Sequence, residues 1–320
     1  MRVVVALGRN ALVSKGESRD GEIQERHVGA AVDALVPLAR DHDLVVIYGN
    51  GPEGGPLAHD GAQDPFLSRS CPYSFDTLAA QTQGMIGYWL LQALENELPG
   101  QQVVSLICQT LVDAEDPAFR HPTMIVGPAY QDDDAQRLAL ERGWQVRRDG
   151  SAWRRAVASP EPQAVIEMPT IRTLLGDGAV VVCAGGGGIP VCRSTSGRLH
   201  GADAVVDSDL TAAMLARDLG ADALLLLTDV AAVEIGFGHE NAQPIRRSSP
   251  SALRIQNCAS GSMGPTVDAA CRFVESTGRV AAIGRLEEAA DVLDGTVGTL
   301  VTSDTLSVDP TLSPVASAVA

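Results

Sequence analysis

The sequence predicts an α/β protein built around a central, mostly parallel β-sheet. Three observations support this prediction. Strand-like runs of Val, Ile and Leu alternate with amphipathic helical patterns along most of the 320 residues. Glycine-bearing loops directly follow three of these runs, at Gly8, at Gly49 and at residues 185–188. Because parallel strands bring their carboxyl ends to one edge of a sheet, we expect the loops to form one shared anion site there.

The chain begins with the pattern of a βαβ unit. Residues 3–7 predict the first strand, residues 24–40 an amphipathic helix, and residues 44–48 the second strand. A longer helical pattern covers residues 75–97, and residues 103–108 predict the third strand. This order favours right-handed crossovers between parallel strands.

The alternation stops at residues 109–164. Prolines, charges and short strand-like pieces predict an inserted lid subdomain here, at about residues 110–164. Its acidic run, Asp132, Asp133 and Asp134, predicts the solvated start of a helix rather than a metal site, because adjacent carboxylates do not share a helix face.

The run at residues 180–191 is the strongest local signal. An apolar, β-branched strand is followed by four consecutive glycines, Gly185, Gly186, Gly187 and Gly188, and then by a proline. Such glycines let the backbone pass close to a ligand and donate N–H groups to a phosphate. The alternative interpretation is a plain tight turn.

The alternation resumes in the second half of the chain. Asp207 or Ser208 is expected to cap a helix that ends at Leu219, and Pro265 marks the first turn of a helix that reaches Thr277. Further strands are expected at residues 223–227, 280–283 and 299–302.

The composition excludes several classes of partner. The formal net charge of −16 argues against nucleic acid and anionic membrane surfaces, because proteins bind both mainly through Lys and Arg. No apolar run reaches the roughly 18 residues of a membrane span, and no signal-peptide pattern follows Met1, so we expect a cytoplasmic protein. The six cysteines and six histidines lack metal-ligand spacing, so we expect no metal site among them and reduced, structural thiols.

Ordered motifs across about residues 1–302 match one known family. They are ALGRNAL, GNGP, QTQGMIGY, DPAF, RR, SPEP, GGGGIP, LTDV and GSMGP. Together they resemble the amino acid kinase superfamily, and most closely its carbamate kinases. The resemblance implies a three-layer αβα sandwich, phosphoryl transfer between ATP and carbamate with Mg²⁺, and a homodimer formed through the N-terminal lobe.

The resemblance also assigns the lobes and their residues. It implies an N-terminal lobe at residues 1–190 and a C-terminal lobe at 191–302, and the Ser, Thr, Pro and Ala content of residues 303–320 predicts a flexible tail. The N-terminal lobe would bind the substrate through Gly8, Asn10, Gly49, Asn50 and Gly51, with Arg154 and Arg155 reaching it from the insertion. The nucleotide would be held by the glycines at 185–188 and by Thr228, Asp229, Val230, Ser262, Met263 and Gly264. The alternative role of the arginine pair is surface charge, since adjacent side chains rarely both point inward.

Three lysine positions of the carbamate kinase pattern hold other residues in this chain. Met124, Ser208 and Thr266 stand where the family has lysines. A cationic clamp on a transferring phosphoryl group is worth roughly 10³ or more in rate, so the losses should remove ordinary turnover unless something replaces them. Arg9 replaces a family glycine, and it either fills the carbamate pocket or brings a new cation into it.

Other site positions have changed or lost their partners. Asp209, which orients the lysines in the superfamily, would here pair with Arg9, hold Mg²⁺ or cap its helix. Tyr48 stands where the family has histidine, and Cys108 where threonine is usual. We expect Cys108 to be a buried thiol rather than a nucleophile.

Three functions follow from these residues. The first is a working carbamate kinase in which Asp209 and Arg9 are catalytic and Arg9, an arginine of the insertion and Mg²⁺ replace the lysines. The second is an enzyme of the same ancestry that acts on another substrate or acyl phosphate. The third is a catalytically silent binding or regulatory subunit whose glycines and prolines persist for packing.

Overall fold

The protein's structure is a computed structural model, and it describes residues 1–8, 21–49, 73–237, 241–256 and 263–303. Its centre is an eight-stranded sheet formed by β1 (Arg2–Leu7), β2 (Asp43–Tyr48), β3 (Val103–Ser105), β9 (Val180–Val182), β12 (Ala223–Thr228), β15 (Arg247–Ser248), β16 (Val280–Arg285) and β17 (Thr299–Val301). The strand order is β15-β17-β16-β12-β1-β2-β9-β3. Neighbouring strands are parallel, except that β16 and β17 are antiparallel.

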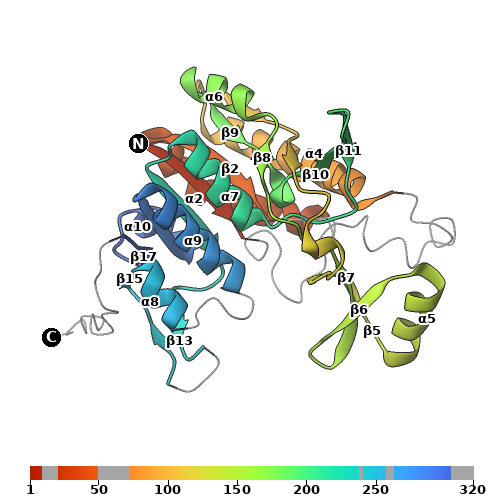
Figure 1. Ribbon diagram of the computed structural model, residues 1–320. Helices are drawn as coiled ribbons and strands as arrows, with labels where there is room; N and C mark the ends of the chain where they lie inside the picture. The colour runs from red at the N-terminus through yellow and green to blue at the C-terminus, as the bar shows by residue number, and fades with distance from the viewer. Residues whose placement is uncertain (9–20, 50–72, 238–240, 257–262, 304–320) are drawn as a thin grey trace.

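Helices cover both faces of the sheet (Figure 1). One face carries α2 (Gly21–Asp41), α4 (Phe75–Glu97) and α10 (Ala289–Leu293). The other carries α6 (Met168–Gly176), α7 (Ser208–Leu219), α8 (Pro250–Ile255) and α9 (Gly264–Thr277). Alternate residues of β1 serve the two layers, because Val3, Val5 and Leu7 face the first and Val4 and Ala6 the second. This arrangement confirms the predicted αβα sandwich.

The third strand is shorter than predicted. The sequence pattern extends it to residue 108, but β3 ends at Ser105. At Cys108 the side-chain amide of Gln83, rather than a neighbouring strand of the main sheet, bonds the backbone. Its oxygen accepts from the Cys108 N–H at 2.9 Å, and its NH₂ donates to the Cys108 carbonyl at 3.1 Å. The chain therefore leaves the main sheet before Cys108.

Beyond Cys108 the chain enters a second sheet and then a separate subdomain. The second sheet has the order β11-β10-β4-β8 and consists of β4 (Gln109–Leu111), β8 (Ala164–Val165), β10 (Ile189–Arg193) and β11 (Leu199–Gly201). The subdomain is a three-stranded antiparallel sheet of β5 (Met124–Tyr130), β6 (Gln145–Asp149) and β7 (Ala152–Val157), packed against α5 (Asp132–Arg142). Figure 1 shows it standing apart from the body. The small remaining elements are η1 (Pro117–Phe119), η2 (Gly185–Gly187), η4 (Leu286–Glu288), β13 (Glu234–Ile235) and β14 (Gln243–Pro244).

Helix α5 explains the acidic run in the insertion. Asp132, Asp133 and Asp134 form its first turn and are exposed, while Ala135 and Leu138 are its buried residues. Carboxylates in this position interact favourably with the positive end of the helix dipole. The run is therefore the solvated helix start that the sequence predicts.

No helix among the described residues is both long and apolar enough to span a membrane. Within the same residues, no group of three or more His, Cys, Asp or Glu side chains could hold a metal ion. Cys108, Cys183, Cys192 and Cys271 are free and buried. The two other cysteines, Cys71 and Cys258, lie outside the described residues.

Helix α7 begins at a carboxylate cap. The side chain of Asp207 accepts from the N–H groups of Asp209 and Leu210 at 2.9 and 3.0 Å. The cap is therefore Asp207, and the interpretation of Asp209 as the capping residue is wrong. Asp209 is the second residue of the helix, and its carboxylate accepts a hydrogen bond from Thr266 instead.

We expect Asp207→Ala to lower the free energy of unfolding by about 1 kcal/mol, because two N–H groups of the first turn lose their acceptor. Asp207→Asn retains an oxygen at the same place and should recover most of the loss. Urea denaturation of the three proteins measures both effects. An alanine variant as stable as the parent would contradict the role of this cap.

Candidate active site

Strands β1, β2 and β12 end side by side at one edge of the sheet. The N–H of Gly8 donates to the Leu227 carbonyl at 2.7 Å, and the N–H of Gly49 donates to the Leu7 carbonyl at 2.7 Å. A Cβ on Gly8 would lie 3.0 Å from the Leu227 oxygen and 3.5 Å from the Thr228 Cβ. The predicted substrate loops and the predicted nucleotide residues thus begin at one edge of the sheet.

The glycine run is held by the protein's own atoms. Added Cβ atoms would overlap the Tyr48 ring at Gly185, the Val206 carbonyl at Gly187 and the Thr110 hydroxyl at Gly188. Gly186, Gly187 and Gly188 have φ values of 64°, 83° and 90°, which glycine adopts most easily. These contacts are what a tight turn requires, and a phosphate cradle at this run remains a prediction.

Two threonines anchor the same turn to the rest of the site. The carbonyl of Gly187 accepts from the Thr110 hydroxyl at 2.7 Å and from the Thr211 hydroxyl at 3.0 Å. Thr211 belongs to the first turn of α7, so the turn is bonded directly to the helix that carries Asp209.

Tyr48 and Cys108, two residues at which the sequence differs from the pattern implied by the resemblance, belong to one buried hydrogen-bond network. The Tyr48 hydroxyl donates to the Gln83 carbonyl at 2.9 Å, and the Gln83 amide pairs with the backbone of Cys108. Burial raises the pKa of Tyr48 well above its ordinary value. The pKa of Cys183 is raised by its contact with the Cys108 thiol and by burial. Cys108 itself is 0% exposed, as expected for a structural thiol.

Asp209 and Thr266 form the polar centre of the site. The Thr266 hydroxyl donates to the Asp209 carboxylate at 2.6 Å, which joins the first turn of α7 to that of α9. Ser208 precedes Asp209 and is half-buried. Of the two positions in this region that the resemblance assigns to lysines, Thr266 bonds the carboxylate and Ser208 is its neighbour in the sequence.

The third of those positions lies elsewhere. Met124 begins β5 and packs against an apolar cluster between the subdomain and α4 that includes Phe75 and Val126. A methionine here contributes packing and no charge.

The two predicted arginines of the insertion have different surroundings. Arg154 donates to the Gly127 carbonyl at 2.7 and 3.0 Å and pairs with Asp149 at 3.0 Å, all within the subdomain. Arg155 lies over the rings of Phe75 and Trp144. The adjacent side chains thus make separate contacts, and binding of substrate by either one remains a prediction.

The remaining predicted residues lie at the ends of the C-terminal elements. Thr228 ends β12 and donates to the Asp229 carboxylate at 3.1 Å, and Val230 follows. Met263 packs against the core, and Gly264 is buried at the start of α9. Five predicted residues, Arg9, Asn10, Asn50, Gly51 and Ser262, lie outside the described residues.

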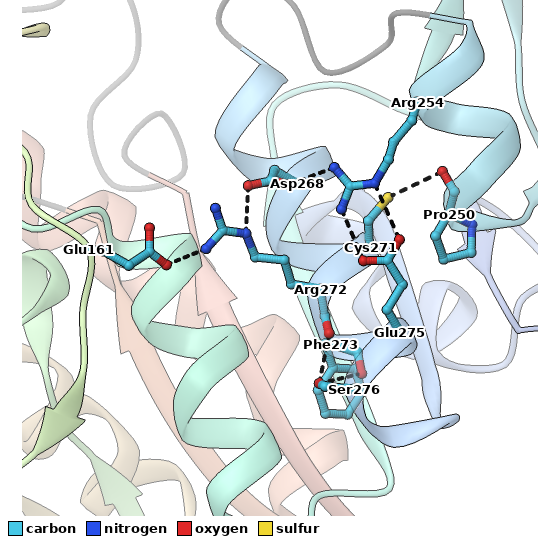
Figure 2. Close-up of polar contacts among 9 residues, drawn as sticks. All are labelled: Glu161, Pro250, Arg254, Asp268, Cys271, Arg272, Phe273, Glu275 and Ser276. Carbon is cyan, nitrogen blue, oxygen red and sulfur yellow. Dashed lines mark hydrogen bonds and ion pairs between the residues drawn. The ribbon is translucent and has the colours of Figure 1, made fainter.

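A chain of ion pairs that the sequence reasoning missed supports α9 (Figure 2). Arg272 pairs with Glu161, which follows the subdomain, and with Asp268 at 2.7 Å. Arg254 of α8 bonds Asp268 at 3.0 Å and Glu275 through two N–H groups. The spacing of Asp268, Arg272 and Glu275 on α9 is a visible signal, but the partners from α8 and from the segment after the subdomain are distant in sequence.

A pocket of ≈ 380 Å³ lies beside this chain, between α7 and α9. It is lined by Leu210, Met214 and Phe273, with Arg217 and Arg272 also in its lining. Both arginines pair with carboxylates, Arg217 with Asp218 at 2.7 Å. The pocket thus lies at the interface between α7, which carries Asp209, and α9, which carries Thr266.

The αβα sandwich, with β1, β2 and β12 ending at one edge, defines the class of α/β protein, and comparisons with known proteins identify its family. The family model described as the amino acid kinase family matches residues 1–284. The chain belongs to the amino acid kinase family. This confirms the family resemblance and the expected enzyme class, a phosphotransferase.

Within that family the chain is carbamate kinase-like. It is 44% identical over 306 residues to the carbamate kinase of Rhizobium meliloti (strain 1021), covering 95% of this chain and 94% of that protein. It is 41% identical to the carbamate kinase of Haemophilus influenzae, covering 95% and 98%. The solved structure of carbamate kinase from Giardia lamblia bound to AMP-PNP superimposes with a TM-score of 0.83 at 33% identity, covering 95% of this chain and 98% of that one.

We expect Gly185→Ala to lower the free energy of unfolding by about 3 kcal/mol, because its methyl group would overlap the Tyr48 ring. Gly176→Ala is the control, since nothing lies within 4 Å of its added Cβ. In a Tyr48→Ala background, Gly185→Ala should cost clearly less, and denaturant titration of all four proteins measures the coupling. Equal costs in both backgrounds would contradict the contact.

The raised pKa of Tyr48 predicts a loss of stability in alkali. The folded state keeps a proton that the unfolded state releases near its ordinary pKa, so this contribution is complete below roughly pH 10 and declines above it. Urea midpoints measured from pH 8 to pH 11 should therefore fall less for Tyr48→Phe than for the parent. Parallel curves would show that Tyr48 does not control this decline.

Proposed function

We propose that this protein transfers a phosphoryl group between ATP and carbamate. The reaction converts ATP and carbamate into ADP and carbamoyl phosphate, and it can run in either direction. The observation that carries the proposal is the junction at Gly8, whose N–H bonds to Leu227 directly before Thr228 and Asp229. The junction supports the proposal because the predicted substrate loop begins beside the predicted nucleotide segment. Similarity to carbamate kinases over 95% of the chain supports the same reaction.

The proposed roles follow the two lobes. The carbamate side consists of Gly8, Asn10, Gly49, Asn50 and Gly51, with Arg154 and Arg155 from the subdomain. The nucleotide side consists of Gly185, Gly186, Gly187, Gly188, Thr228, Asp229, Val230, Ser262, Met263 and Gly264. Phosphoryl transfer depends mainly on holding the reacting oxygens in line and neutralising charge, which loops from two lobes can do together.

Asp209 is the proposed charged residue at the reaction centre. In this chain the Thr266 hydroxyl holds its carboxylate at 2.6 Å and fixes its orientation. The oxygens of Asp209, Ser208 and Thr266 are hard donors, and their chemistry fits Mg²⁺. Bound with ATP, Mg²⁺ would supply positive charge to the phosphates, and Arg9 would supply a second cation from the substrate loop.

A repurposed enzyme is the second candidate. Its support is the chemistry of Met124, Ser208 and Thr266, none of which can provide the charge of a lysine. Met124 packs against an apolar cluster, so it offers neither a charge nor a polar group to a substrate. Such an enzyme would use carbamoyl phosphate or a related acyl phosphate without efficient synthesis of ATP.

The assembly and location of the protein are further predictions. By analogy with the family we propose a homodimer formed through the N-terminal lobe and a cytoplasmic location. Sedimentation of the purified chain tests the first, and cell fractionation tests the second.

Titration calorimetry with ATP and Mg²⁺ and then with carbamoyl phosphate, followed by an assay of ATP formation from ADP and carbamoyl phosphate, tests the proposed function. Saturable nucleotide binding and ATP above a no-enzyme control are expected. Nucleotide binding without ATP formation would favour the repurposed enzyme. Binding of neither nucleotide nor carbamoyl phosphate would contradict both and favour a silent subunit.

We expect Thr266→Lys to raise kcat for ATP formation about tenfold or more, because it restores a cation beside Asp209. Ser276→Lys adds the same charge to the last turn of α9, away from the site, and should leave kcat unchanged. Initial rates at saturating ADP and carbamoyl phosphate measure the effect. A similar response to both substitutions would rule out a specific role for charge at residue 266.

A further inference from the structure

The subdomain meets the body at a small apolar joint. We call this cluster the docking joint, and its buried members are Phe75, Leu78, Val126, Val157 and Val205. Phe75 and Leu78 come from α4, Val126 and Val157 from the subdomain, and Val205 from the segment that leads into α7. Five side chains are a small contact area for a whole subdomain, so polar contacts around the joint contribute to its position.

Arg155 spans the docking joint. Its guanidinium carbon lies 4.7 Å from the centre of the Phe75 ring and 4.6 Å from the centre of the Trp144 ring. Phe75 is the first residue of α4, and Trp144 lies between α5 and β6 of the subdomain. Both distances are within the range of a cation–π contact, so one side chain binds a ring on each side of the joint.

Asp203 connects this arginine to the body. One carboxylate oxygen of Asp203 lies 4.0 Å from the Arg155 guanidinium, and the other accepts from the Phe75 N–H at 3.1 Å. The carboxylate therefore holds the arginine and the first backbone N–H of α4 at the same time.

The segment around Asp203 leads directly to the candidate active site. The Val205 N–H donates to the Ala158 carbonyl at 2.9 Å, and Ala158 pairs with Ala204. Asp207 then caps α7, and Asp209 follows in its first turn. A shift of the subdomain at Arg155 would thus act on a short, hydrogen-bonded path to Asp209.

Arg148 is a matched comparison within the same protein. It lies 5.4 Å from the centre of the Trp153 ring and 3.8 Å from the Asp132 carboxylate. Those contacts have the same chemistry as those of Arg155, but every partner belongs to the subdomain. Losing Arg148 should therefore leave the docking joint unchanged.

From this geometry we infer that Arg155 is a positioning residue, which fixes the subdomain against α4 and against the segment that carries Asp209. Its planar guanidinium suits this role, because it can stack on two rings and bind a carboxylate at its edge. The role in docking stands on the contacts alone. Its effect on the reaction rests on the proposed function.

Hydrogen exchange of the full chain tests the docking role. The amide of Phe75 donates to Asp203 and that of Val205 to Ala158, so peptides covering 73–80 and 200–208 report on the joint. Arg155→Gln should raise exchange in both peptides about fivefold, Asp203→Asn should raise it by a smaller factor, and Arg148→Gln should leave it unchanged. Arg155→Lys retains the charge without the planar group and should lie between the parent and Arg155→Gln.

The kinetic measurement tests the consequence for the reaction. In the ATP-forming assay, Arg155→Gln should lower kcat about tenfold while KM for ADP stays within about twofold, as expected when reacting groups are misplaced. Unchanged exchange in Arg155→Gln and Asp203→Asn would overturn the inference, whether or not the parent has activity. An unchanged kcat despite faster exchange would overturn the link to the reaction. A parent protein without ATP formation would overturn the proposed function and leave the exchange result to decide the docking role.

Discussion

The candidate active site depends on the pairing of β1 with β12. These strands are far apart in the sequence, yet they are neighbours in the middle of the sheet, and Val3–Leu7 run parallel to Ala223–Leu227. The hydrogen bond from Gly8 to Leu227 continues this pairing one residue beyond β1. The predicted substrate and nucleotide segments can share a site because this pairing brings the ends of β1 and β12 to one edge of the sheet.

The unusual residues of the site form connected groups. Tyr48 packs against Gly185 and bonds to Gln83, and Gln83 binds the backbone of Cys108. Since every polar group in this network has a partner, the substitutions at Tyr48 and Cys108 are compatible with one stable arrangement. Thr266 similarly gives Asp209 a hydrogen-bond donor at a position where the resemblance implies a lysine.

The charge balance around the site explains why Mg²⁺ and Arg9 matter to the proposal. Arg154, Arg155 and Arg272 all contact carboxylates of the protein itself. These pairs are partly exposed, so each contributes little to stability, but together they hold the subdomain and α9 in place. Mg²⁺ and Arg9 would add positive charge beyond these paired arginines.

The sequence alone determined the sandwich, the α4 helix, the helical start at Asp132 and the family, because these depend on apolar periodicity, caps and ordered motifs within short stretches. It predicted an overlong third strand, since periodicity could not show that Gln83 takes the backbone bonds of Cys108. The sequence predicted Asp207 or Ser208 as the cap of α7, and the structure selects Asp207. Only the tertiary structure decided that Thr266 binds Asp209 and that Arg155 contacts Phe75. Each of these contacts joins residues that are distant in the sequence, so its geometry depends on how the elements pack, and the pattern of residue types along a chain does not encode such a distance.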